Sequence, residues 1–294
     1  MRAQKFGGNW TEDKLNCLYQ YLKQYKLIFD RNPRAKYFTT IYFDAFAGSG
    51  YRENERKSEQ KSLFGYDKDA ESYLKGSPII SLELDSPFHK YYFVEKNPDY
   101  SKELQKIVLR FEKLKDRISI INRDANDFII EFCQNTDWKK SRAVMFLDPY
   151  GMQIEWAVLR EIANTQAIDL WLLFPLGVGV NRLLMKGEIP RGKWAEALKR
   201  LFGNDCWKDF YSEEEQPTLF GPEKIAKKTA TIDDIGKCFV DRLKTIFCSV
   251  TNQPLKLFNS KNNPIFLLIF ASNNKKSGKV ALRIAEYIIN SKRK

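Results

Sequence analysis

The sequence predicts an α/β protein whose mostly parallel sheet carries helices on both faces. Two largely apolar runs, at 143–148 and 168–174, have the composition of strands that are buried on both sides. Segments with helical periodicity lie between the predicted strands, and parallel pairing produces this alternation. The third observation is a turn at 44–50, Asp-Ala-Phe-Ala-Gly-Ser-Gly, which follows a buried strand. Its glycines allow backbone N–H groups to approach a ligand closely.

The elements can be assigned in chain order. Residues 12–29 carry large apolar side chains at three- and four-residue spacing, which predicts an amphipathic helix with Thr11 as its N-cap. A later helix is predicted to start with Ser77 as N-cap and Pro78 at its first position. Seven strands are predicted, at 40–45, 91–95, 117–122, 143–148, 168–174, 254–258 and 264–271. Further helices are predicted at 99–114, 124–134 and 155–164, and after the last strand as far as Asn290.

Two segments interrupt the alternation. Residues 51–75 hold six basic and six acidic side chains and few large apolar ones, which predicts a charged, flexible insertion. It is either a solvated loop or a segment that closes over a substrate. Residues 177–250 read as helical, so we expect a helical insertion between the fifth and sixth strands. The chain is therefore predicted to be a single domain, 1–294, with two insertions.

Composition narrows the functional classes. No apolar run reaches the roughly 20 residues that cross a bilayer, and the first residues lack the apolar core of a signal peptide. The five cysteines are scattered without a CxxC pair, so neither a disulfide framework nor a metal site is predicted and a cytoplasmic setting is expected. The formal net charge of +12 favours a polyanionic partner, with nucleic acid first, or reflects basic residues spread generally along the chain.

Acidic residues stand at or just after four of the predicted strand ends: Asp44, Glu95, Asp124 and Asp148. In an open parallel sheet these ends line the ligand crevice at the point where the strand order reverses. Each acid by itself is better explained as a helix N-cap or a loop carboxylate. Their succession along the chain predicts a pocket for a nucleoside-type ligand.

Each position has a plausible task in such a pocket. The turn that starts at Asp44 would pass beneath the ligand, and Glu95 would accept hydrogen bonds from both ribose hydroxyls. Asp124 would accept from the adenine amino group, and the next backbone N–H would donate to the adenine ring. The predicted cofactor-binding residues are Asp44, Phe46, Gly48, Gly50, Glu95, Asp124 and Ala125.

These motifs resemble the Rossmann-like class I S-adenosylmethionine-dependent methyltransferases at residues 44–50, 94–96, 124–126 and 148–151. The chain is more closely similar to the three-Cys-motif partner protein family, TcmP, over nearly its whole length. That resemblance rests on Trp10-Thr11 with Lys14-Leu15 and on residues 43–48, 76–78, 146–152, 169–177 and 267–272. It implies S-adenosylmethionine as cofactor and a seven-stranded methyltransferase sheet. It also implies a partner protein with a three-cysteine motif that resembles radical S-adenosylmethionine enzymes.

The turn Asp148-Pro149-Tyr150-Gly151 bears on the reaction. It is similar to the Asp/Asn-Pro-Pro-aromatic turn of methyltransferases that act on exocyclic amines of bases, but it has one proline. It is closer to the Asp-Pro-Phe-Gly turn of tRNA guanine-N2 methyltransferases. The resemblance implies catalytic roles for Asp148, Pro149 and Tyr150, with Tyr150 stacking on a base. Three alternatives stay open: a turn that only closes the pocket, a non-catalytic scaffold for the three-cysteine protein, and a small-molecule methyltransferase.

Basic residues near aromatic ones are candidate contacts to nucleic acid. One group lies close to Trp194 in the 177–250 insertion, and the other opens the C-terminal segment 275–294, which holds seven basic residues and one acidic residue. The predicted nucleic-acid contacts are Arg191, Lys193, Lys199, Arg200, Lys275 and Lys276. The alternative is an ordinary amphipathic helix followed later by a solvated tail.

Overall fold

A computed structural model describes residues 10–50, 76–184, 188–218 and 221–293. The charged insertion predicted at 51–75 lies outside these residues. Eight of the described strands form one sheet in the order β3-β2-β1-β4-β5-β10-β8, and β9 also pairs with β10. The strands are β1 (Thr39–Asp44), β2 (Lys90–Val94), β3 (Ile118–Ile121), β4 (Ser141–Leu147), β5 (Ile168–Phe174), β8 (Ser249–Val250), β9 (Leu255–Phe258) and β10 (Pro264–Ser272).

The first five strands run parallel, and β10 is antiparallel to β5. The sheet has eight strands where seven were predicted, because β8 and β9 follow one another along the same side of β10. β8 pairs with Ala271 and Ser272, and β9 pairs with the other end of β10. The order along the sheet reverses between β1 and β4. This reversal defines the crevice in which open parallel sheets bind ligands.

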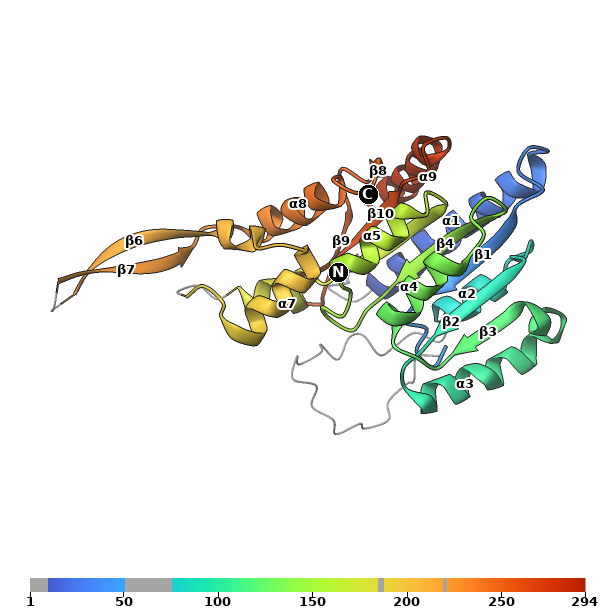
Figure 1. Ribbon diagram of the computed structural model, residues 1–294, viewed down its shortest axis with the longest axis horizontal. Coiled ribbons are helices and arrows are strands. Elements are labelled where there is room, and N and C mark those ends of the chain that lie inside the picture. Colours follow the sequence, from blue (N-terminus) through green and yellow to red (C-terminus); the bar gives the residue numbers. More distant parts are fainter. Residues whose placement is uncertain (1–9, 51–75, 185–187, 219–220, 294) are drawn as a thin grey trace, which may run out of the picture.

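Helices cover both faces of the sheet (Figure 1). One face packs against α1 (Trp10–Arg31), α2 (Ser77–Leu82), α3 (Pro98–Val108) and α9 (Gly278–Ser291). The other face packs against α4 (Ala125–Asn135), α5 (Trp156–Asn164), α7 (Gly192–Phe202) and α8 (Ile232–Leu243). Shorter helical turns are η2 (Leu109–Arg117), η3 (Leu176–Val180), α6 (Asn181–Leu183) and η4 (Cys206–Phe210). In the described part of the chain, no helix has the length and apolar character needed to cross a membrane.

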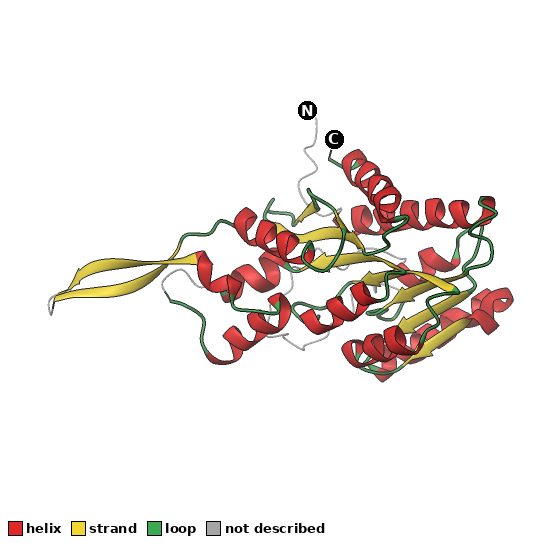
Figure 2. Cartoon of the chain, turned by 45° about the horizontal axis from the view of Figure 1, so that its top comes forward, coloured by secondary structure: helices red, strands yellow, loops and turns green. Residues whose placement is uncertain are grey.

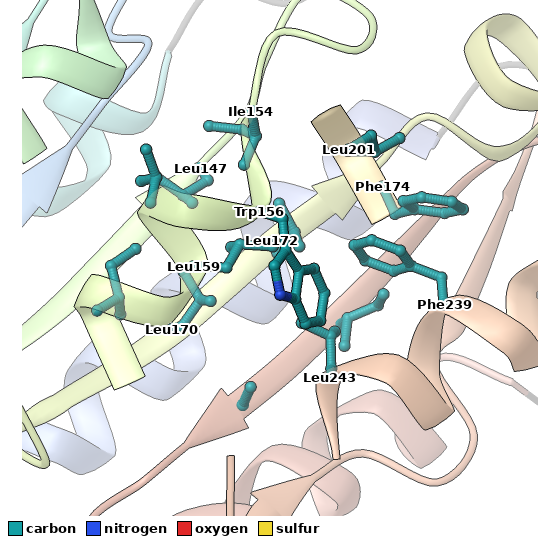
Figure 3. Packing of buried hydrophobic residues seen from close by; sticks show 14 of the residues in the cluster. Leu147, Ile154, Trp156, Leu159, Leu170, Leu172, Phe174, Leu201, Phe239 and Leu243 are labelled. Carbon is teal, nitrogen blue, oxygen red and sulfur yellow. The ribbon is translucent and has the colours of Figure 1, made fainter. Parts of the chain in front are cut away.

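The core on the second face is built around the end of β5. Phe174 stacks on Phe239 of α8 with ring centroids 4.0 Å apart and ring planes 17° apart (Figure 3). Trp156 of α5 and Leu201 of α7 lie in the same cluster. Aromatic pairs add about 0.5–1.5 kcal/mol beyond their buried area. This packing fixes α5, α7 and α8 to the sheet.

A two-stranded hairpin, formed by β6 (Tyr211–Thr218) and β7 (Gly221–Lys228), projects from the body of the protein (Figures 1 and 2). This hairpin replaces part of the helical insertion predicted at 177–250, where Glu213, Glu214 and Glu215 favour helices and show no alternation of apolar and polar residues. Pairing across the hairpin compensates for this composition. Lys227 Nζ, for example, lies 2.9 Å from Oε1 of Glu214 on the opposite strand. The predicted helical insertion therefore consists of helices on either side of a β-hairpin.

Candidate active site

Asp44 ends β1, which lies between β2 and β4, and its side chain is completely buried. Its Oδ1 accepts a hydrogen bond from the N–H of Phe46 and its Oδ2 accepts one from the hydroxyl of Tyr42, each at 3.4 Å. The hydroxyl of Ser77 donates a further hydrogen bond. Burial nevertheless raises the pKa of Asp44 to about 7, and the charge of Asp148 adds to the increase. A cation next to Asp44 would therefore favour its ionised form.

Ser77 was predicted to be the N-cap of α2, but its side chain contacts Asp44 instead. Gly76 is the N-cap of α2, and Ser77 lies within the helix. The same displacement occurs in the first helix, where Thr11 lies inside α1 and is buried. Both residues have typical N-cap chemistry, and the hydroxyl of Ser77 donates to Asp44 and does not cap the helix.

The turn after β1 contains two glycines with different tasks. Gly50 has φ +73°, which favours glycine, and a Cβ there would lie 2.3 Å from Cδ1 of Ile107, so this side chain of α3 would have to shift. Gly48 has φ +60°, and the closest atom to a Cβ there would be the hydroxyl oxygen of Tyr150 at 3.9 Å. Gly48 is thus the position at which the backbone is open to a ligand. The N–H of Gly76 donates to the carbonyl of Gly50 at 3.0 Å.

Glu95 directly follows β2 and connects two loops. Its Oε2 accepts from the N–H of Gly48 at 2.9 Å, and its Oε1 accepts from the N–H of Asn97 at 2.7 Å. Burial raises the pKa of Glu95, although these backbone hydrogen bonds act in the opposite direction. An ionised carboxylate has about four lone-pair sites. The N–H of Lys96 also donates to this carboxylate. One lone-pair site is therefore left for a ligand hydroxyl.

Asp124 is the N-cap of α4. Its Oδ1 accepts from the N–H of Asn126 at 3.0 Å, and its Oδ2 lies 3.1 Å from Nζ of Lys96. Burial acts to raise the pKa of Asp124, but the hydrogen bonds from Lys96 and Asn126 outweigh it and lower the pKa. The capping role that the sequence left open is therefore present. Ala125, the first residue of α4, is buried.

Asp148 follows β4 and forms an ion pair that the sequence analysis did not predict. Nζ of Lys14 lies 2.5 Å from its Oδ2, and the Lys14 side chain is 1% exposed. The ammonium group also lies 5.0 Å from the ring centroid of Trp10, one helical turn earlier. A signal was present in the sequence, because Lys14 stands four residues before the core residue Leu18 on the apolar stripe of α1. A lysine at such a position needs a buried partner.

The residues after Asp148 form a turn that leaves an aromatic ring exposed. Pro149 is buried, whereas Tyr150 is 57% exposed. The N–H of Tyr150 donates to Oε1 of Gln153 at 3.0 Å, and Gly151 has φ +76°, which suits a tight turn. The hydroxyl of Tyr150 lies over the glycine turn at Gly48. The ring is thus placed beside the same crevice as the acids.

Strand register brings three of the predicted acids to one edge of the sheet. Asp44 is level with Phe93 of β2 and with Phe146 of β4, so Glu95 and Asp148 each lie two residues beyond it. β3 pairs with β2 and leads to Asp124 at the same edge. Asp44 and Asp148 flank the reversal of strand order between β1 and β4.

The predicted basic contacts do not lie together. Lys193, Lys199 and Arg200 are exposed on α7, with Arg191 at its N-cap. Phe202 at the end of α7 contacts Phe174 at the end of β5, so α7 lies at the edge that carries the acids. Lys275 and Lys276 follow Ser272, which pairs with Asp169 near the start of β5. The lysine pair therefore lies near the amino end of β5, whereas the acids lie at the carboxyl ends of the parallel strands.

No family model and no curated protein matches this chain. Among solved structures, protein LPL1258 from Legionella pneumophila aligns with 97% of this chain over 92% of its own length, with 11% identity and a TM-score of 0.49. A putative methyltransferase from Escherichia coli covers 72% of this chain and 86% of its own, with 12% identity and a TM-score of 0.30. The glycopeptide N-methyltransferase MtfA, in complex with S-adenosyl-L-homocysteine, covers 93% of both chains, with 10% identity and a TM-score of 0.33.

The strand order and strand directions of the sheet define the architecture of this protein. Five parallel strands in the order β3-β2-β1-β4-β5 are followed by antiparallel β10, and helices cover both faces. This is the Rossmann-like class I methyltransferase fold.

Proposed function

We propose that this chain is an S-adenosylmethionine-dependent methyltransferase and that its acceptor is an exocyclic amine of a nucleic-acid base. The observation that carries the proposal is the position of Asp44 and Asp148, which end adjacent strands on either side of the reversal in strand order. Ligands of open α/β sheets bind at this point. Asp44 faces the cofactor side of the crevice in this proposal, and Asp148 faces the acceptor side.

The residues at this edge fit S-adenosylmethionine, which supplies an electrophilic methyl group on a positively charged sulfur when it is bound. Asp44 is buried with a pKa raised to about 7, and a cationic ligand would compensate for the cost of its ionisation. Glu95 accepts from three backbone N–H groups and retains one lone-pair site for a ribose hydroxyl. Asp124 and the backbone of Ala125 stand next to it at the edge, where they would contact adenine. The polar groups of these four residues therefore support S-adenosylmethionine as the cofactor.

The acceptor side is formed by the turn after β4. An exocyclic amine is a poor nucleophile because its lone pair is delocalised into the ring. The carboxylate of Asp148 and the carbonyl of Pro149 would accept its two N–H bonds and favour a pyramidal nitrogen. Lys14 already occupies Oδ2 of Asp148, so Oδ1 is the oxygen left for the amine. Lys14 thereby fixes the orientation of the carboxylate, and such positioning accounts for much of the rate in group transfer.

Tyr150 would supply the contact to the base itself. Its exposed ring lies beside the crevice, and stacking of a base on an aromatic side chain contributes about 1–3 kcal/mol. Stacking tolerates every base, because each has a π face. Tyr150 would therefore hold the base while Asp148 and Pro149 select an amine.

Titration calorimetry with S-adenosylmethionine tests the cofactor assignment. We expect the wild type to bind, and we expect Asp44→Ala and Glu95→Ala to lose binding while circular dichroism shows them folded. The matched control is Asp99→Ala, which changes an exposed acid on α3 and should bind like the wild type. Absence of binding by the wild type would contradict the proposal.

A second candidate is a scaffold for a three-cysteine-motif protein, and the hairpin of β6 and β7 favours it. An isolated two-stranded hairpin is only marginally stable in water. Its strands pair only with each other among the described residues, so both outer edges can accept a partner strand. Asp148→Ala separates the two functions. Loss of methyl transfer with retained binding of the purified partner favours the enzyme, and unchanged biological function favours the scaffold.

A further inference from the structure

Two cysteines that are far apart in the sequence lie side by side at the base of the hairpin. Cys206 begins η4, which leads directly into β6, and Cys238 lies in α8. Their sulfur atoms are 3.6 Å apart, and the Cys238 thiol donates to Cys206. Both residues are partly exposed. Cys17 and Cys133, by contrast, are buried.

The surroundings distinguish the two thiols. The hydrogen bond from Cys238 lowers the pKa of Cys206, and the guanidinium of Arg242 assists, while burial and the charge of Asp209 act in the opposite direction. The hydrogen bond with Cys206 raises the pKa of Cys238. Arg242 is held in place, because it donates two hydrogen bonds to the carbonyl of Phe202 at 3.2 and 3.1 Å. A thiol with a lowered pKa and partial exposure is the one that attacks in thiol–disulfide exchange.

We infer that Cys206 and Cys238 are a redox-active pair that forms a reversible disulfide by exchange with a low-molecular-weight disulfide such as oxidised glutathione. The Cys206 thiolate attacks one sulfur of that reagent, whose S–S bond breaks and releases one thiolate. The Cys238 thiol then loses its proton and attacks the Cys206 sulfur in the mixed disulfide, which expels the second thiolate. Two protein thiols are oxidised in total, and one reagent disulfide is reduced to two thiols.

The bridge would close a loop that contains the whole hairpin. Cys206 and Cys238 stand 32 positions apart, and β6 and β7 lie between them. One end of the bridge lies at the base of the hairpin. The other lies in α8, next to Phe239, which stacks on Phe174 in the core. Oxidation would therefore fasten the base of the hairpin to the core, and reduction would release it.

The test is mass spectrometry of the full chain after incubation with oxidised glutathione. For the wild type, the expected product is a cross-linked peptide pair that joins Cys206 to Cys238, and dithiothreitol should reverse it. Cys238→Ser should instead trap glutathione on Cys206. In Cys206→Ser the cross-linked peptide pair should be absent, because the attacking thiol has been removed. Cys248 is the internal control, since it is exposed and its sulfur contacts Ser249 and Ser272 rather than a thiol.

Two results would overturn the inference. One is separate glutathione adducts on Cys206 and Cys238 of the same wild-type molecule, and the other is no reaction at either residue while Cys248 reacts. Should a serine variant fail to fold, alkylation of the wild type before and after oxidation still decides. Protection of both Cys206 and Cys238 without added glutathione mass supports the bridge, and continued alkylation of either contradicts it.

Discussion

Nζ of Lys14 lies 2.5 Å from Oδ2 of Asp148, so an ion pair joins the first helix to the turn that carries the proposed acceptor site. The lysine is buried and the carboxylate is 20% exposed. A buried charge without its partner is strongly destabilising, whereas an apolar replacement of the whole pair can be neutral. The pair therefore links the stability of the fold to the orientation of the acceptor carboxylate.

Replacement of the lysine tests this link. Lys14→Met should lower kcat about 10- to 100-fold, because Asp148 loses the group that orients it. It should also reduce the free energy of unfolding by about 3–5 kcal/mol, because Asp148 loses its partner. Steady-state kinetics and urea denaturation measure the two effects.

The double variant Lys14→Met/Asp148→Asn provides the control. It removes both charges, so most of the unfolding free energy should return while activity stays low. Full activity in Lys14→Met, with or without the second change, would show that the ion pair serves only the fold.

Asp44 should give the protein a specific dependence of stability on pH. Its pKa is raised from 3.8 to about 7, so between these values the folded protein binds a proton that the unfolded chain has lost. The contribution of Asp44 to stability is therefore present at low pH and is lost as pH rises towards 7. The slope is at most about 1.4 kcal/mol per pH unit.

Denaturation of the wild type and Asp44→Asn across this range measures the effect. The difference in unfolding free energy between them should shrink or change sign as pH rises, since asparagine cannot ionise. Affinity for S-adenosylmethionine should increase over the same range in the wild type alone, because the ionised carboxylate favours a cation. A difference that does not vary with pH would contradict the raised pKa.

The two glycines after β1 should respond differently to the same substitution. Gly50→Ala places a Cβ against Ile107 at positive φ, so we expect a loss of about 2–4 kcal/mol in unfolding free energy from crowding and backbone strain. Among the described residues, the closest atom to the new Cβ of Gly48→Ala is the Tyr150 hydroxyl oxygen at 3.9 Å, so the change should cost only about 1–2 kcal/mol of strain. Its main effect should be weaker binding of S-adenosylmethionine. Equal losses of stability with unchanged cofactor affinity would argue against the assignment of Gly48 to the ligand crevice.

Basic residues on α7 should contribute to nucleic-acid binding. Each phosphate contact to a single strand contributes about 0.7 to the slope of log affinity against log salt concentration. The double variant Lys199→Gln/Arg200→Gln should therefore reduce that slope by about 1.4 and lower methylation of a short oligonucleotide. Filter binding across a salt series measures the slope.

The matched comparison is Lys275→Gln/Lys276→Gln, which removes the same charge near the amino end of β5. It should leave methylation of a short oligonucleotide unchanged. Binding without salt dependence in the wild type would favour a small-molecule methyltransferase.

The succession of acids at strand ends could be predicted from sequence because each depends on a local pattern, a short apolar run followed by an acid. The strand count was one too low, since β8 is only two residues long and shares one edge of β10 with β9. Lys14 could have been identified from its place on the apolar face of α1. Its partner could not, because Asp148 is 134 positions away and only the packing of α1 on the sheet joins them.

The hairpin of β6 and β7 and the contact between Cys206 and Cys238 could not be predicted from local sequence patterns. The strand β6 has a composition that favours helix, and its pairing with β7 depends on long-range register. Cys206 and Cys238 show no motif spacing, because the hairpin between them sets their separation. Ser77 failed as a predicted cap for a related reason, since its hydroxyl bonds to Asp44 of β1.

The most direct test of the proposed function is transfer of label from methyl-labelled S-adenosylmethionine to purified pools of RNA, DNA and protein. Wild type and Asp148→Ala are compared after calorimetry has shown that both bind the cofactor. We expect label on an amine nitrogen of a base in RNA or DNA with the wild type, and at least about a hundredfold less with the variant. Label found only on protein, or equal transfer by the two chains, would contradict it.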